Sequence, residues 1–114
     1  MHRINTGPYE NKKPKAAVLL VHGLIDSSDT WIMNGRNNSV AFILADSGYD
    51  VWLANCRGNK YSMNHTYLDP SKDFLYWDNT HNFIARFDIP AFIEYAKKES
   101  MVPKVSYIAH SIAT

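Results

Sequence analysis

The residues with the clearest chemical potential lie at the end of the printed sequence, where Ser111 has small residues two positions away on each side. The run is Ala109-His110-Ser111-Ile112-Ala113, and it follows the apolar run 105–108. A strand that ends in small-x-Ser-x-small is typical of a sharp turn into a helix, which lifts the serine Oγ above the edge of a sheet. The pattern therefore predicts a nucleophilic serine that would form an acyl-enzyme.

A second element far upstream fits the same chemistry. Residues 15–21 form a nearly continuous apolar run, which is typical of a buried parallel strand, and they lead directly into His22-Gly23-Leu24. In an α/β-hydrolase the turn after such a strand supplies one backbone N–H of the oxyanion hole, and the residue after the nucleophile supplies the other. We expect these donors to be Leu24 and Ile112. Taken alone, His22-Gly23 also fits a plain strand-to-loop turn with a half-buried histidine.

The chain between these two motifs alternates strands with helices. The patterns predict strands over 15–21, 49–54 and 105–108, and helices over 39–46 and 88–99. A strand, helix, strand, helix, strand series favours the α/β class with a parallel sheet. Ligands of such sheets bind beyond the carboxyl ends of the strands, which is where the two motifs lie.

Local signals mark the ends of the two expected helices. Ser47-Gly48 closes the first helix, because glycine tolerates positive φ past a helix end. Asp88 is the expected N-cap of the second, and Pro90 is tolerated in its first turn. The apolar residues of this helix recur at i, i+3, i+4 and i+7, at Ile89, Phe92, Ile93 and Ala96.

The sequence resembles the acid lipases, the family of gastric lipase and lysosomal acid lipase. The similarity runs over nearly the whole chain, through His2-Arg3-Ile4, His22-Gly23-Leu24, residues 37–53, Asn55 with Arg57-Gly58-Asn59, and Asp88-Ile89-Pro90-Ala91. The resemblance implies the N-terminal part of an α/β-hydrolase fold, with a mostly parallel sheet flanked by helices. Residues 1–114 would be a partial domain that ends after the nucleophile strand, without the cap domain and the C-terminal half.

The resemblance also implies a function. Ser111 matches the nucleophile of the family, and Leu24 and Ile112 match its oxyanion donors. The chain would then belong to a serine ester hydrolase that acts on triacylglycerol or steryl esters, at a lipid–water interface, with no cofactor and no metal. The family usually has Gly-His-Ser-Gln-Gly, whereas this chain has Ala109, Ile112 and Ala113. It also tends to have an acidic pair where this chain has Asn82 and Phe83.

The proton-transfer partners of Ser111 are not expected within the chain. In an α/β-hydrolase the acid and the histidine of the triad follow the serine, so the isolated chain should be inactive or nearly so. His110 cannot serve as the base, because neighbouring side chains at a sharp elbow point apart. The other histidines precede the elbow and are expected at a strand-end turn or at solvated loop positions: His2, His22, His65 and His81.

Cys56 is the only cysteine, so it allows no internal disulfide, and it forms no recognised metal-site spacing with the histidines. A catalytic thiol is one interpretation of it, and a small residue after a strand is the other. The loop 55–59 follows a strand end and is expected either to line the cleft or simply to form a turn. The aromatic residues could contact an acyl chain or belong to the core: Trp31, Trp52, Phe74, Tyr76 and Trp77.

Composition and charge set limits on the partners and the location of the chain. It has 114 residues, 46% of them hydrophobic, and a formal net charge of +1. The sequence has no sustained basic face, which argues against nucleic acid as a partner. The lysines at 12, 13 and 15 are expected in a solvated loop. No apolar run is long enough to span a bilayer. No signal peptide follows Met1, which we interpret as an internal position or a mis-set start.

The resemblance implies a secreted or lysosomal protein. Two sequons are compatible with that route, and they place potential N-glycosylation at Asn37 and Asn64. Two interpretations from other functional classes remain: a lipase-like protein that binds lipid without catalysis, and a truncated product without function. A third keeps the hydrolase fold and changes the substrate, because fold does not fix function.

Overall fold

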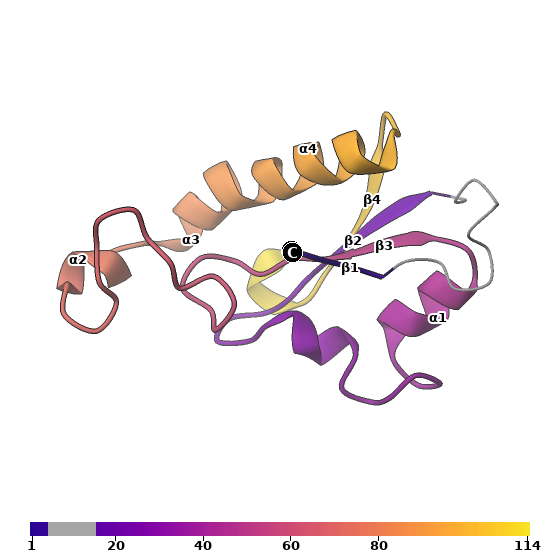
Figure 1. Ribbon diagram of the computed structural model, residues 1–114, viewed down its shortest axis with the longest axis horizontal. Coiled ribbons are helices and arrows are strands. Elements are labelled where there is room, and N and C mark those ends of the chain that lie inside the picture. Colours follow the sequence, from indigo (N-terminus) through magenta and orange to yellow (C-terminus); the bar gives the residue numbers. More distant parts are fainter. Residues whose placement is uncertain (5–15) are drawn as a thin grey trace.

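The computed structural model describes residues 1–4 and 16–114. Its strands are β1 (His2–Ile4), β2 (Ala17–Val21), β3 (Asp50–Leu53) and β4 (Val105–Ala109), and they form one sheet in the order β1-β3-β2-β4 (Figure 1). β2 pairs in parallel with β3 and with β4, whereas β1 runs antiparallel to β3. The α/β class with a mostly parallel sheet is thus confirmed.

The two longer helices cover opposite faces of this sheet (Figure 1). α1 (Val40–Asp46) packs on one face and α4 (Ile89–Ser100) on the other. The remaining helical segments are short, and they are η2 (Ser28–Trp31), α2 (Phe74–Trp77), α3 (His81–Phe83), the π-helical η3 (Ile84–Asp88) and η4 (Ser111–Ala113). The sheet and its two helices form three layers, and the segment with α2 extends away from them.

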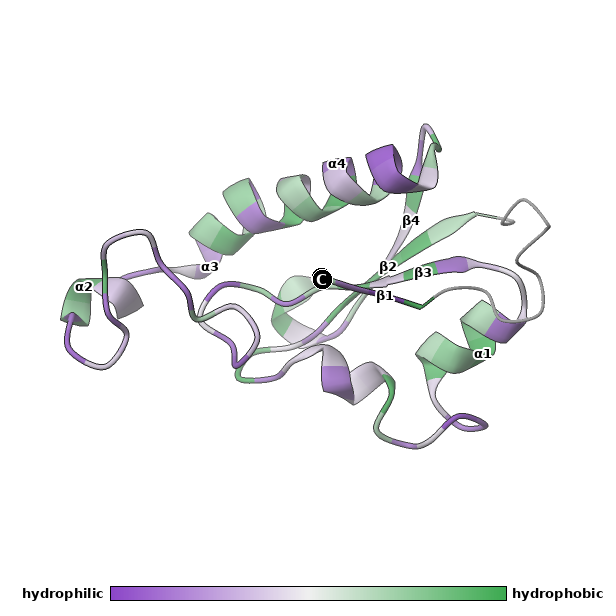
Figure 2. Ribbon diagram, in the orientation of Figure 1, coloured by the Kyte–Doolittle hydropathy of each residue, from purple (hydrophilic) through white to green (hydrophobic). Residues whose placement is uncertain are grey.

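The central strand β2 supplies the core of both layers. All five of its residues are buried, because each face of the strand meets a helix. Leu19 and Val21 face the α4 side, where Phe92, Ile93 and Ala96 pack, and Leu20 faces the α1 side. Figure 2 shows β2 as an apolar strand, in contrast to the hydrophilic end of α4. This two-sided burial explains the continuous apolar run that predicted the strand.

The other predicted elements lie close to their expected bounds. The first helix ends before Gly48, which has a positive φ of 92° as its position at a helix end requires. Lys15 and the predicted lysine loop lie outside the described residues. No helix in residues 1–4 and 16–114 is long and apolar enough to cross a membrane.

Two expectations about elements were wrong. The sequence predicted three strands, and β1 is a fourth; its three residues are mostly exposed and show no apolar pattern. Asp88 does not cap α4, because its backbone is already helical and the chain has followed helical segments since His81. The Asp88 carboxylate instead accepts hydrogen bonds from Arg57. The Asp88 carboxylate therefore forms an ion pair with Arg57 and does not cap α4.

A buried carboxylate anchors the end of the sheet that lies opposite the strand-end loops. Asp50 is 3% exposed, and it accepts two hydrogen bonds of 2.8 Å from the Arg3 guanidinium. Ser100 Oγ donates to the same carboxylate at 2.5 Å, and Trp52 Nε1 donates to Ser100 Oγ at 2.9 Å. The Asp50 side chain therefore joins β1, β3 and the end of α4, and Asp50 raises the pKa of Arg3 mainly through these hydrogen bonds.

We predict that Asp50→Ala lowers the free energy of unfolding by about 2–3 kcal/mol, because three buried or half-buried donors lose their acceptor. Urea denaturation followed by circular dichroism measures this loss. Asp46→Ala is the matched control, since it removes the exposed ion pair with Arg36 and should change stability by about 0.5 kcal/mol or less. Equal losses in the two variants would contradict the anchoring role of Asp50.

Candidate functional site

The ends of β2 and β4 bring the two predicted motifs together. The strands pair in parallel up to Val21 and Ala109, and the His110 N–H then donates to the Val21 carbonyl at 3.1 Å. Gly23 packs directly against the turn after β4. A Cβ on Gly23 would lie 3.0 Å from His110 Nδ1 and 3.2 Å from Ser111 Cβ. A side chain at this position would therefore require His110 or Ser111 to shift by a few tenths of an ångström.

Ser111 has a strained backbone. Its φ is +59°, in the left-handed region, and only two other described residues apart from glycine, Ile25 and Met101, share a positive φ. Such a conformation costs about 1–3 kcal/mol and persists only where the surroundings hold it. Ser111 is exposed and begins the short helical turn η4 directly after β4. A positive φ at the serine directly after the strand fits the small-x-Ser-x-small pattern, and the role of Ser111 as a nucleophile stays a prediction.

The expected oxyanion donors lie on the two sides of this contact. Leu24 is 56% exposed and Ile112 is 38% exposed. Among the described residues, neither main-chain N–H donates a hydrogen bond to another group. Neither amide is therefore committed to a partner in the described part of the chain.

A cleft of about 950 Å³ opens at this edge of the sheet. The loops after β2 and β3 line it together with the segment from α2 to the start of α4 and the last three residues of the chain. Leu24, Ile112 and Cys56 line it. Ser111 is not among the lining residues, and it directly precedes Ile112 in the sequence. The predicted role of loop 55–59 as a wall of the cleft is confirmed for residues 56–59.

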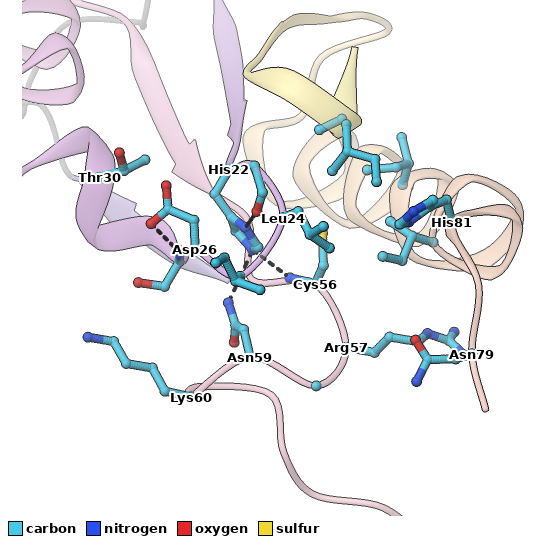
Figure 3. A pocket seen from close by; sticks show the side chains of 18 of the residues that line it. His22, Leu24, Asp26, Thr30, Cys56, Arg57, Asn59, Lys60, Asn79 and His81 are labelled. Atoms are coloured by element: carbon cyan, nitrogen blue, oxygen red, sulfur yellow. Dashed lines mark hydrogen bonds between the residues drawn. The ribbon is translucent and has the colours of Figure 1, made fainter. Parts of the chain in front are cut away.

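A buried histidine connects two of these loops. His22 is 5% exposed, its Nδ1 lies 2.7 Å from the Gly23 carbonyl, and its Nε2 accepts the Cys56 N–H at 3.1 Å. The Asn59 side-chain nitrogen also lies 3.1 Å from Nε2. Figure 3 shows the ring between the end of β2 and the loop that contains Cys56 and Asn59. The expected strand-end turn at His22 is present, but the expectation of a half-buried histidine was wrong, because the ring is buried and both of its nitrogens have partners.

The hydrogen bonds continue beneath the cleft through two further buried residues. Asn59 donates to Asn55 Oδ1 at 2.8 Å, and the Ser28 N–H donates to the same oxygen at 3.0 Å. Asn55 Nδ2 donates to Ser28 Oγ at 3.1 Å. We call His22, Ser28, Asn55 and Asn59 the floor network. Sequence reasoning did not find it; the only signal was the position of Asn55 and Asn59 after a strand end.

Ion pairs hold the rim of the cleft. The Arg57 side chain donates to Asp88 at 2.6 and 2.9 Å, and these hydrogen bonds raise the pKa of Arg57. Lys60 and the Tyr61 hydroxyl both donate to Asp29, and these bonds lower the pKa of that carboxyl. The loop after β3 is thus tied to η3 on one side and to η2 on the other.

The remaining histidines make contacts away from Ser111. His2 lies on β1 and not on a loop as expected, with Nδ1 3.2 Å from Ser28 Oγ. His65 accepts two backbone N–H bonds within its own loop, and His81 lines the cleft from α3. Within the described part of the chain, Ser111 Oγ has no histidine partner.

The aromatic residues divide between core and surface. Trp52 and Tyr76 are buried, whereas Phe74 is 86% exposed, and of the five aromatic candidates only Trp77 lines the cleft. Figure 2 shows α2, which carries Phe74, as partly hydrophobic and partly pale at the extended end of the molecule. In residues 1–4 and 16–114, no group of three or more His, Cys, Asp or Glu side chains is placed to hold a metal ion.

Comparisons with known proteins point to one family. The family model for the partial alpha/beta-hydrolase lipase region matches residues 1–35. Lipase 1 of Drosophila melanogaster is 45% identical over 111 residues, which is 97% of this chain and 24% of that protein. The chain is a lipase-like region of the α/β-hydrolase fold.

Two relatives with more specific names agree. Gastric triacylglycerol lipase of Mus musculus is 42% identical over 105 residues, covering 92% of this chain and 26% of that protein. Human lysosomal acid lipase/cholesteryl ester hydrolase is 40% identical over 106 residues, covering 93% and 26%. The lipase-like chain thus spans about a quarter of the length of the curated relatives it matches.

We predict that Gly23→Ala lowers the free energy of unfolding by about 1–2 kcal/mol, because its new methyl group displaces the turn at Ser111. Urea denaturation measures the change. The same substitution in a His110→Ala background is the control. The exposed His110 ring can move into solvent and Ser111 Cβ cannot, so the loss should persist there. Full recovery in that background would contradict a contact with Ser111 Cβ.

The reactivity of Cys56 tests whether its thiol could be catalytic. It is buried, and burial together with the Asp88 carboxylate raises the pKa of its thiol to about 11. The thiolate is the reactive form, so at about pH 8 iodoacetamide should alkylate the folded chain about 100-fold more slowly than the chain in guanidinium chloride. Mass spectrometry measures both rates. Fast alkylation of the folded chain would restore the catalytic interpretation.

The same shift has a consequence for stability. Because the pKa is raised in the folded state, the folded chain holds this proton more tightly than the unfolded chain does. The stabilisation of the folded chain by this Cys56 proton is complete below pH 9.0, and it is lost as the pH rises toward 11.

Proposed function

We propose that this lipase-like chain carries the nucleophile and the oxyanion hole of a serine ester hydrolase. The observation that carries the proposal is the contact between Gly23 and Ser111, since it joins the turn after β2 to a strained serine at the end of β4. Similarity to lipases over most of the chain supports the same chemistry.

In the proposed reaction Ser111 Oγ attacks the ester carbonyl carbon and forms a tetrahedral intermediate. The N–H groups of Leu24 and Ile112 donate to its oxyanion, and the removal of one such donor typically lowers turnover by about 10²–10³. Collapse of the intermediate breaks the ester C–O bond and releases the alcohol. Water then attacks the acyl-enzyme, releases the fatty acid and restores the Ser111 hydroxyl.

The proton acceptor for Ser111 is the missing part of this reaction. A general base must come within about 2.6–3.2 Å of the hydroxyl that it deprotonates. His22 is engaged in the floor network, and His2 and His65 contact other groups. His81 lines the cleft, and no hydrogen bond joins it to Ser111 in the described part of the chain. We therefore propose that the 114-residue chain alone does not turn over, and that in the α/β-hydrolase order the acid and the base follow Ser111.

We propose a lipid ester as the substrate. One relative is named as a triacylglycerol lipase and another as a cholesteryl ester hydrolase. The cleft suits an acyl chain, because apolar side chains contribute to its walls, among them Leu24, Ile25, Met33, Trp77, Ile84 and Ile112. We propose a secreted or lysosomal location, which the names of the same relatives support. The two sequon residues, Asn37 and Asn64, are both exposed.

The test is active-site labelling with a fluorophosphonate, which reacts with activated serines. We predict strong labelling at Ser111 in a chimera in which this chain replaces the matching quarter of mouse gastric triacylglycerol lipase. The same chimera with Ser111→Ala should remain unlabelled, and the isolated chain should react at least about 10³-fold more slowly, because it lacks the base.

Either of two results would contradict this account. An unlabelled Ser111 in a folded chimera would remove the catalytic assignment. Efficient labelling of the isolated chain would show that it contains its own base.

Lipid binding without catalysis is the second candidate function. The observation that favours it is Ile112, an apolar residue lining the cleft where the family usually has glutamine. A folded chimera that binds a fluorescent triacylglycerol analogue, and neither reacts with the fluorophosphonate nor hydrolyses the ester, would support this function instead.

A further inference from the structure

The hydrogen bonds of His22 define which ring nitrogen carries the proton. A backbone N–H can only donate, so Nε2, which receives the Cys56 N–H, must be unprotonated. The proton of the neutral ring is then on Nδ1. The 2.7 Å contact with the Gly23 carbonyl is therefore a hydrogen bond that Nδ1–H donates.

The Gly23 carbonyl and the Leu24 N–H belong to the same peptide group. That group is planar and trans, so its C=O and N–H point in opposite directions. A side chain that fixes the carbonyl of Gly23 therefore also fixes the direction of the Leu24 amide.

Little else in this loop holds that peptide. Gly23 permits backbone conformations that other residues avoid, and the Leu24 N–H donates to no described residue. The next residue, Ile25, has a positive φ of 53° and a fully exposed side chain. A rotation of the Gly23–Leu24 peptide would replace the amide by a carbonyl oxygen, which would repel an oxyanion.

The ring itself is held from the opposite side. Besides the Cys56 N–H, the Asn59 side chain contacts Nε2 (Figure 3). Asn59 is fixed in turn by its bond to Asn55. The loop after β3 thus sets the position of a ring that acts on the loop after β2.

We propose that His22 is a positioning residue, which holds the Gly23–Leu24 peptide so that the Leu24 N–H faces the oxyanion site. The proposal rests on the proposed function, because it concerns the direction of one of the two oxyanion donors. His22 does not touch the substrate; it acts through the Gly23 carbonyl.

Two amide variants test the hydrogen bonds of His22 Nδ1 and Nε2 separately. In His22→Asn the side-chain nitrogen can take the place of Nδ1 and donate to the Gly23 carbonyl, while Cys56 N–H loses its acceptor. In His22→Gln the amide reaches the position of Nε2, while the donor to Gly23 is lost. Both variants are made in the chimera with mouse gastric lipase, and hydrolysis of a triacylglycerol is measured.

We expect His22→Asn to keep kcat within about fivefold and His22→Gln to lower kcat about 10²-fold with little change in KM, as for the loss of one oxyanion donor. A purely structural role predicts that kcat follows the fraction of folded protein in both variants. Equal kcat values in the two variants, or a larger loss in His22→Asn, would overturn the proposal. Activity that survives in Ser111→Ala would instead contradict the proposed function.

A spectroscopic measurement tests the hydrogen bond without any activity. The ¹⁵N chemical shifts of the His22 ring in the 114-residue chain distinguish a protonated nitrogen from an unprotonated one. We expect the proton on Nδ1. A proton on Nε2 would overturn the proposal, even if the chimera is active.

Discussion

The parallel pairing of β2 with both neighbours is the constraint on which the rest of the structure depends. Parallel strands end at the same edge of a sheet, so the loops after β2, β3 and β4 have to meet there. Their backbone and polar side chains are then partly removed from water, and each buried group needs a partner. The floor network of His22, Ser28, Asn55 and Asn59 meets this requirement with hydrogen bonds between loops that are distant in the sequence.

The energetics of this network differ from those of the rim. A buried hydrogen bond contributes about 1 kcal/mol, whereas a buried group left without a partner costs about 1–3 kcal/mol. The members of the floor network therefore depend on one another, and the loss of one affects both loops. The ion pairs of Arg57 and Lys60 are more exposed, so they contribute less to stability and mainly fix the loop after β3. The strain at Ser111 is of a similar size to one such bond, and the surrounding turn can offset it.

The departures from the usual acid lipase pattern have a physical explanation at two of three positions. The methyl groups of Ala109 and Ala113 pack against the core cluster that contains Leu19 and Val21. These alanines therefore fill space that glycine would leave empty, and the turn at Ser111 still forms. Ile112 is different, because its side chain is exposed at the cleft. Its main-chain N–H is unaffected by the change of side chain, which is why the proposed oxyanion hole tolerates it.

The sequence by itself determined the elements with strong local patterns. The apolar run of β2, the helical spacing in α4 and the small residues around Ser111 each reflect contacts with near neighbours or a full layer of core, so they can be recognised in a single chain. Only the tertiary structure decided the rest. β1 is three residues long and is a strand because β3 pairs with it, and Asp88 is not a cap because Arg57 binds its carboxylate. The state of the His22 ring depends on Cys56 and Asn59, which are 34 and 37 residues away. No local pattern encodes those partners, since it is the register of the parallel strands that brings them together.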